Sequence, residues 1–245
     1  MSFSHGFLPC LFLVPVPDNA QAKLEGDPNR LVAAALVAEA TWRAFPGFMA
    51  ELEVEHHGRT SHGRVIVEPD GRVFVESVPD SPRDWAVAYL DCLVRHQLAQ
   101  DDVGKKTWMF VNPRDQRTPW GQAVCPTDAP FGPFYWIRDG RFHAVDGRVA
   151  MNKQRLTTLK TEHNPDNKHL PAVQVLHLWN AQSLELESTE TRVLSWRRVG
   201  SFDLPSTIQV LSAGTAAETT RPAFGRIVIT RHRLFSAPES LLASK

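Results

Sequence analysis

Ala50-Glu51-Leu52-Glu53-Val54-Glu55 is the stretch that decides the fold, because apolar and acidic side chains alternate along its whole length. Side chains of a β-strand point alternately to its two faces, so a period of two predicts a strand with one buried and one solvated face. The same period returns around Val65 and around Val73. Turn formers at Gly58 and at Pro69-Asp70-Gly71 separate the runs. This region is therefore predicted to be an antiparallel meander.

A helical period flanks the meander on both sides. Asp27-Pro28 is typical of an N-cap followed by proline at the first helical position, and Pro46-Gly47 of a stop, which predicts a helix over residues 28–45. Ser81-Pro82 opens a second predicted helix over residues 82–99. Both helices carry apolar side chains at spacings of three and four, which is typical of a helix that buries one face. The stripe of the second helix comprises Trp85, Ala88, Tyr89, Cys92 and His96.

From residue 107 to residue 234 the pattern is that of short strands and turns, interrupted by a proline-rich loop at 112–133. The predicted strands include residues 185–193 and 195–199, and Asp139-Gly140 is one of the predicted turns. Two early helices and a long antiparallel run predict an α+β, mostly antiparallel β fold. The sheet is expected to be strongly curved, a half-barrel with two helices packed on its concave face. The expected organisation is an N-terminal arm, a single curved-sheet domain and a flexible tail, at residues 1–26, 27–235 and 236–245.

Composition excludes some classes of protein. Lys+Arg 27 against Asp+Glu 27 gives a formal net charge of +0, which argues against nucleic-acid binding because phosphate neutralisation needs a basic excess. The three cysteines fit no disulfide or zinc framework and favour a reducing compartment. The apolar stretch at 7–16 lacks the basic flank of an export signal. No other apolar run approaches the ~18 residues of a membrane span. The expected location is cytoplasmic, with no transmembrane segment.

Three further stretches carry a likeness to a known family. The first is Phe45-Pro46-Gly47-Phe48, which runs into residues 49–55 and on to Gly71-Arg72-Val73. The other two are Phe134-Tyr135-Trp136-Ile137-Arg138-Asp139-Gly140 and residues 196–205, which read Trp-Arg-Arg-Val-Gly-Ser-Phe-Asp-Leu-Pro. In combination they resemble the uncharacterised bacterial family catalogued as domain of unknown function 3386, which has no established activity. The order of elements is also similar to that of the lipoprotein-carrier half-barrels. That similarity implies an acyl chain held between a curved sheet and helical lids.

Histidines and acidic residues gather at two turns. Three imidazoles or a group of oxygen ligands can hold a divalent metal. Adjacent strand residues point to opposite faces, however, and residues around Asn164-Pro165 are common turn formers, so solvated turns are the preferred interpretation. No metal and no cofactor are therefore predicted. The two groups are His56, His57 and His62, and Glu162, His163, Asp166 and His169.

Aromatic side chains form the richest candidate set, for which core packing and the lining of an apolar cavity are both open interpretations. His96 and His177 lie on apolar faces, where a hydrogen-bonded core histidine and a general base are alternatives. Arginines on the late strands protect a sheet edge or meet an anionic headgroup. The predicted ligand-binding side chains are Trp85, Trp136, Trp179, Trp196, His177, Arg198 and Arg231.

These features favour a non-enzymatic binding protein that holds an apolar small molecule or acyl chain between the curved sheet and the helical lids. One alternative is an accessory protein that binds a protein partner through the N-terminal arm and the proline-rich loop. Another is an enzyme of unrecognised type with a histidine base, which the absence of nucleotide-binding, zinc-protease and nucleophile-elbow motifs disfavours. A cavity of about 300 Å³ or more beneath the helices would favour ligand binding.

Overall fold

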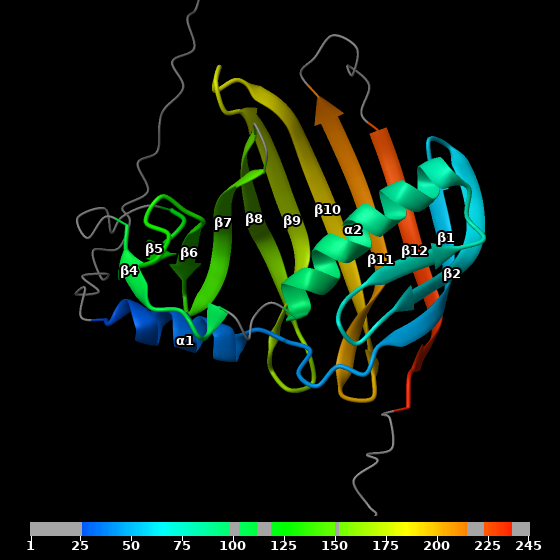
Figure 1. The fold of residues 1–245 in the computed structure, drawn as a ribbon, viewed down its shortest axis with the longest axis horizontal. Coiled ribbons are helices and arrows are strands. Elements are labelled where there is room, and N and C mark those ends of the chain that lie inside the picture. The colour runs from blue at the N-terminus through cyan, green and yellow to red at the C-terminus, as the bar shows by residue number, and fades with distance from the viewer. Residues whose placement is uncertain (1–25, 99–102, 112–118, 150–151, 215–222, 237–245) are drawn as a thin grey trace, which may run out of the picture.

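A single antiparallel sheet dominates the computed structural model, which describes residues 26–98, 103–111, 119–149, 152–214 and 223–236. Twelve strands of the described chain follow one another in the order β3-β2-β1-β12-β11-β10-β9-β8-β7-β6-β5-β4 (Figure 1). The strands are β1 (Phe48–His56), β2 (Arg59–Val67), β3 (Val73–Glu76), β4 (Trp108–Phe110), β5 (Gln122–Pro126), β6 (Phe134–Arg138), β7 (Arg141–Val149), β8 (Asn152–His163), β9 (His169–Asn180), β10 (Leu186–Val199), β11 (Phe202–Gly214) and β12 (Ala223–Leu234).

Most neighbours in this sheet are also neighbours in the sequence, and the exception is the junction of β1 with β12. There the first hairpin is attached to the last strand, through register partners such as Glu51 and Thr230. β3 and β4 stand at opposite ends of the strand order, so the sheet is open and not a closed barrel. The predicted fold class, an α+β protein with a mostly antiparallel, curved half-barrel sheet, is confirmed.

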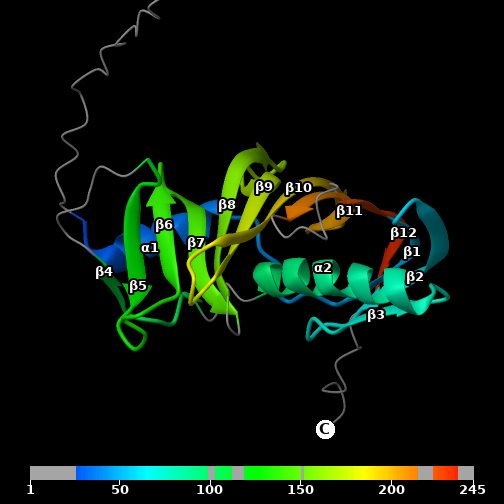
Figure 2. The same ribbon diagram turned by 90° about the horizontal axis from the view of Figure 1, so that it is seen from above.

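Both helices lie on one face of the sheet. α2 (Asp80–Leu98) runs diagonally across the concave face, and the β1–β3 end of the sheet curls around it (Figures 1 and 2). α1 (Pro28–Ala38) packs near the other end, against β4, β6 and β7. Tyr135, Val145 and Leu156 are successive register partners and therefore point to the same face. Tyr135 packs with the α1 cluster and Leu156 lines the space under α2, which places both helices on the same side.

The hydrophobic core has two parts. The larger lies between α2 and the strands at the β1–β12 junction, where Leu52 and Val54 are buried and Glu51 is exposed, as the period of two predicts. The smaller lies beneath α1, where Val32 and Ala35 meet Trp108. Between these two parts, helix side chains do not fill the concave face of the sheet. The site described below lies in this space.

The first helix is shorter than predicted. The sequence predicts residues 28–45, but α1 ends at Ala38, and Glu39 already has an extended backbone with φ −81° and ψ 146°. Tertiary hydrogen bonds hold the following segment away from the helix axis. The Ala40 N–H donates to the His169 carbonyl at 2.9 Å, and the Trp42 indole N–H donates to the Asp203 carbonyl at 2.9 Å. The apolar stripe beyond residue 38 is therefore buried by an extended segment.

The late strands are longer than predicted. Separate strands over 185–193 and 195–199 are expected from the sequence, whereas β10 runs through both and is irregular between Ser195 and Trp196. A β-bulge of this kind lets the side chains of one long strand switch from one face of the sheet to the other without ending the strand. Residues 1–25, 112–118 and 237–245, which include most of the predicted arm and tail and part of the proline-rich loop, lie outside the described residues. No helix of the described chain is long and apolar enough to cross a membrane.

Candidate functional site

A cavity of about 270 Å³ lies between α2 and the concave face of the sheet. Apolar side chains provide most of its sheet wall, so a nonpolar molecule inside it would be removed from water. The indole N–H of Trp196 donates to the Pro171 carbonyl at 2.7 Å, which fixes the ring in that wall. The lining residues are Tyr89, Cys92, Leu93, Arg95, His96 and Gln97 from α2 and Leu156, Pro171, Gln174, Arg192, Leu194, Trp196 and Ile208 from the sheet.

The predicted stripe of the second helix faces this cavity in part. Tyr89, Cys92 and His96 line it, whereas Ala88 is exposed. The fully buried positions of α2 form a neighbouring row that packs into the main core. That row is Ala86, Leu90, Val94 and Gln97. Because residues three and four apart share a helix face, the two rows are adjacent faces, one for the core and one for the cavity.

An ion pair stands in the cavity wall where α2 meets β10. Arg192 Nε lies 2.5 Å from Glu190 Oε1, and the two side chains are only 13% and 14% exposed. The Tyr89 hydroxyl donates to Glu190, and the Arg192 guanidinium lies 5.0 Å from the centre of the Tyr89 ring. Arg192 Nη1 also donates to Cys92 Sγ at 3.8 Å. The charges in this wall are therefore paired with each other.

A smaller cavity of about 30 Å³ adjoins the first and shares four wall residues with it. Glu39, at the end of α1, contributes a carboxyl to this polar extension. Burial raises the pKa of Glu39 to about 7, although the Arg141 charge and a hydrogen bond from the Phe142 N–H act in the opposite direction. The shared residues are His96, Leu156, Pro171 and Gln174, and the others are Glu39, Phe142, His143, Ala144, Val145, Thr158 and Thr161.

Two histidines of the polar extension are held in the neutral form. Burial lowers the pKa of His143, which is 8% exposed, and the Arg138 and Arg141 charges lower it further. Burial among protein atoms also lowers the pKa of His96. A substantial part of the His96 surface is nevertheless accessible to water. His96 lines both cavities, so part of its accessible surface faces them.

Of the predicted ligand-binding side chains, Trp196 lines the main cavity and the other six do not. Trp85 packs beside it, with its ring 4.9 Å from those of His56 and Tyr89. Its indole also covers Gly225 of β12 so closely that an added Cβ there would lie 2.4 Å from the ring. Trp85 is thus a core residue behind the cavity wall.

Trp136, Trp179 and His177 lie on the opposite, convex face. Arg155 and His177 are register partners, and Arg155 is the neighbour of Leu156, which points to the cavity. The Arg155 guanidinium lies 5.6 Å from the Trp136 ring, and His177 stacks on Trp179 with ring centres 5.5 Å apart. These aromatic groups are therefore separated from the cavity by the sheet itself.

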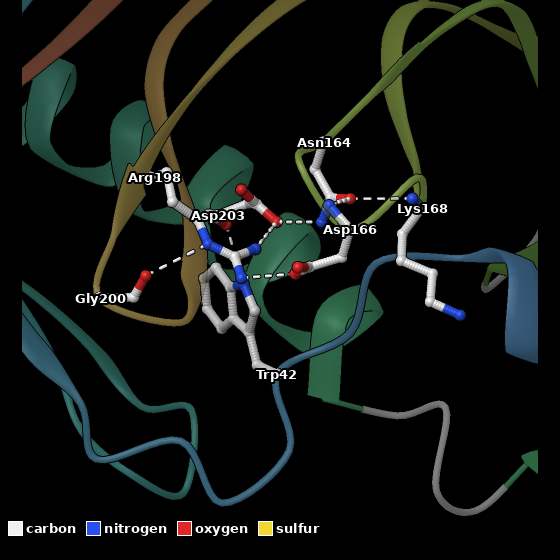
Figure 3. Close-up of polar contacts among 7 residues, drawn as sticks. All are labelled: Trp42, Asn164, Asp166, Lys168, Arg198, Gly200 and Asp203. Carbon is white, nitrogen blue, oxygen red and sulfur yellow. Dashed lines mark hydrogen bonds and ion pairs between the residues drawn. The ribbon is translucent and has the colours of Figure 1, made fainter.

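Arg198 is part of a polar network at the ends of the β8–β9 and β10–β11 hairpins (Figure 3). Arg198 Nη1 lies 2.8 Å from Asp203 Oδ2, and Nη2 lies 2.5 Å from Asp166 Oδ2. Asn164 Nδ2 donates to the same Asp203 oxygen at 2.7 Å. Together with the Trp42 bond to the Asp203 carbonyl, these contacts tie both hairpins to the segment after α1. The arginine is thus occupied by two carboxylates.

Arg231 and the predicted histidine groups also lie away from the cavity. Arg231 Nη1 pairs with Glu51 Oε1 at 2.8 Å, and the two side chains are 75% and 56% exposed. His56 stacks on Trp85, and His163 and His169 have ring centres 4.6 Å apart. Among the residues that the structure describes, no group of three or more His, Cys, Asp or Glu side chains could hold a metal ion.

Sequence reasoning missed Glu39, Arg141 and Gln174 as site residues. Glu39 falls inside the predicted first helix, where a single acidic residue gives no signal of its own. Gln174 alternates with Val173 and Val175 and is 7% exposed, so a buried polar position within an apolar strand is the signal that could have found it. Arg141 follows the Asp139-Gly140 turn, where the sequence predicts only the first residue of a strand.

The fold and the site define an open antiparallel half-barrel with an apolar cavity beneath a lid helix. The chain belongs to the family described as "Protein of unknown function (DUF3386)", whose family model matches residues 25–227. The resemblance stated from the sequence is thereby confirmed. No curated protein matches the chain.

Two solved structures are similar to the chain. One is a LolA superfamily protein from Nitrosomonas europaea, at 7% identity and a TM-score of 0.27, covering 89% of this chain and 98% of that one. The other is a DUF1329 family protein from Desulfovibrio piger, at 7% identity and a TM-score of 0.29, covering 85% of this chain and 94% of that one. At these TM-scores neither structure assigns a ligand to this chain.

Proposed function

We propose that the chain is a non-enzymatic binding protein that holds an apolar small molecule or acyl chain between the curved sheet and α2. The observation that carries the proposal is the cavity of about 270 Å³ with a largely apolar sheet wall. A space of about 270 Å³ is slightly smaller than the roughly 300 Å³ at which typical ligand pockets begin, so it suits a slender molecule or a single chain.

Native mass spectrometry of the protein isolated from its own host tests the proposal. A discrete extra mass that is lost on denaturation is the expected result, and extraction would then identify the ligand. The bare mass of the chain, for protein that has never been exposed to detergent or organic solvent, would contradict a tightly held ligand.

A cavity-filling variant provides the matched control. Cys92→Trp places an indole in the cavity from the helix side, and we expect it to abolish the extra mass. Ala88→Trp introduces the same side chain on the same helix at a position that does not line the cavity and should retain the extra mass. Loss of the extra mass in both variants, with both still folded by circular dichroism, would argue that the molecule is bound elsewhere.

One specific observation favours each of two other functions. Phe131, in the described part of the proline-rich loop, is 93% exposed, which suits a partner-binding accessory protein. His96 lines both cavities, which leaves open an enzyme with a histidine base, whereas His177 lies on the convex face. A co-purifying protein would favour the first, and turnover of an extracted ligand that His96→Gln abolishes would favour the second. The cytoplasmic location and the absence of nucleic-acid binding stay predictions.

A further inference from the structure

We propose that the polar extension of the cavity holds the headgroup of the ligand, and that this headgroup is a hydroxyl or another hydrogen-bonding group without a negative charge. The proposal rests on the proposed function and specifies the chemical class of the ligand. The ligand would be an amphiphile such as a long-chain alcohol or a lipid with a free hydroxyl, with its tail in the apolar cavity.

The first step of the argument is the position of the extension. It shares His96 and Gln174 with the main cavity, so one molecule can touch both spaces. A tail packed against Leu194 and Ile208 would point its other end toward Glu39. The extension holds about 30 Å³, which admits a compact headgroup of a few atoms and excludes a phosphodiester or a sugar.

The second step is the hydrogen-bonding chemistry of its wall. Gln174 Nε2 donates to Thr158 Oγ1 over a long 3.4 Å, and Arg141 Nη1 donates to Thr161 Oγ1 at 2.8 Å. The Glu39 carboxyl accepts a hydrogen bond from the Phe142 N–H, and its remaining lone pairs can accept another at the end of the cavity. A ligand hydroxyl can donate to that carboxyl and accept from the amide or a neutral imidazole.

The third step is charge. A carboxylate or phosphate headgroup would place a second negative charge beside the Glu39 carboxyl, which is itself largely buried, and two like charges at such a site are unfavourable. A hydroxyl carries no such penalty. The Arg192 charge at the other end of the main cavity is already neutralised by Glu190 and offers no alternative anion site.

Glu39 is also the group that titrates near neutrality in this wall. The other titratable or charged groups around it are His96 from α2, Arg141 and His143 from β7 and His169 from β9. The pKa of each of these three histidines is lowered, by burial and, for His143 and His169, by the Arg141 charge. They are neutral in neutral and alkaline solution, Arg141 stays charged, and β8 contributes uncharged threonines.

The experiment measures the binding of 1-decanol and of decanoate to the full chain by displacement of a fluorescent apolar probe, at about pH 8.5 and about pH 6. We expect wild-type protein to bind 1-decanol equally at both pH values and decanoate about tenfold more weakly than 1-decanol at the higher pH. The affinity for decanoate should rise at the lower pH, where Glu39 is protonated.

Glu39→Gln keeps the shape of the side chain and removes its charge, so this variant should bind decanoate equally well at both pH values. Glu55→Gln is the matched control and should behave as wild type, because Glu55 lies on the face of β1 opposite the buried Leu52 and Val54. Equal binding of decanoate and 1-decanol by wild type at about pH 8.5 would overturn the headgroup assignment and leave the proposed function standing. Binding of neither probe would overturn both. The pH dependence of decanoate binding by the wild type tests the headgroup assignment even if Glu39→Gln fails to fold.

Discussion

Arg198 and Asp203 face each other across the β10–β11 turn, with Nη1 of the guanidinium 2.8 Å from Oδ2 of the carboxylate. The carboxylate is 7% exposed and the guanidinium side chain 29% exposed, so the pair is largely removed from water. Both residues belong to the Trp-Arg-Arg-Val-Gly and Phe-Asp-Leu-Pro stretch that carries the family resemblance. The structure thus gives that stretch a physical role, which is to fix two hairpins to the segment that follows α1.

Arg198→Ala should therefore destabilise the protein. It leaves the buried Asp203 carboxylate without its cation, and removing one partner of a partly buried pair costs about 1–3 kcal/mol. Urea unfolding followed by tryptophan fluorescence measures the change. Arg231→Ala is the control, because its pair with Glu51 is exposed and such pairs contribute about 0–1 kcal/mol. Equal losses in the two variants would show that burial of Asp203 has no energetic consequence.

The stability of the protein should depend on pH through Glu39. Its folded-state pKa is about 7 against an ordinary value of 4.5, so the folded state binds the proton more tightly than the unfolded state. The resulting stability is fully present below pH 4.5 and is lost as the pH rises through about 7. The loss amounts to about 3 kcal/mol at alkaline pH.

Comparison with Glu39→Gln isolates this contribution from the other titrating groups. The variant should exceed the wild type in free energy of unfolding at about pH 8.5, and the difference should shrink as the pH falls toward 4.5. Urea titrations at several pH values provide the measurement. A difference that does not vary with pH would mean that the Glu39 carboxyl is not buried in its charged form.

The chain has two tyrosines, Tyr89 and Tyr135, and both should resist deprotonation. Burial raises the pKa of each above the ordinary 10.0, and the Glu190 carboxylate raises that of Tyr89 further. An alkaline titration followed by tyrosinate absorbance should therefore show less ionisation near pH 10 than two free tyrosines would, while the protein is folded. Ionisation of both tyrosines near pH 10 in the folded protein would contradict the burial of the Tyr89–Glu190 contact.

Gly225→Ala should destabilise the protein by about 1–3 kcal/mol, which is typical of overpacking a filled core. The added Cβ would lie 2.4 Å from the Trp85 ring, so the helix or the ring must shift. Gly147→Ala is the matched control within the same sheet, because its nearest contact is an ordinary 3.6 Å to Gln154. The control should stay within about 0.5 kcal/mol of wild type in thermal or urea unfolding. If both variants unfold alike, Trp85 does not pack against β12 as described.

Much of the fold is predictable from local pattern. The alternation at 50–55 places Leu52 and Val54 in the core, and the turns around the β6–β7 hairpin fall where Asp139 and Gly140 predict them. The end of α1 is not predictable in this way, because the hydrogen bonds that hold Ala40 and Trp42 come from strands far along the chain.

The candidate site was predictable only in outline. An apolar space beneath the second helix follows from the order of elements. Which tryptophans line that space depends on the face of the sheet to which each side chain points. A shift of one residue turns a strand side chain to the other face. Trp196 reaches the cavity from β10, whereas Trp136 and Trp179 point away from it. Glu39 enters the site only because α1 ends one residue earlier.

The junction of β1 with β12 has a consequence for synthesis of the protein on the ribosome. The hairpin of β1 and β2 is translated before β12, the strand that completes its pairing, and all the other strands of the sheet are translated between them. Until then β1 exposes a row of unpaired backbone groups and one face of apolar side chains. The nascent chain must wait in that state, because contacts between distant segments form only after the loop between them closes. A truncation that removes β12 would leave this edge of β1 exposed permanently.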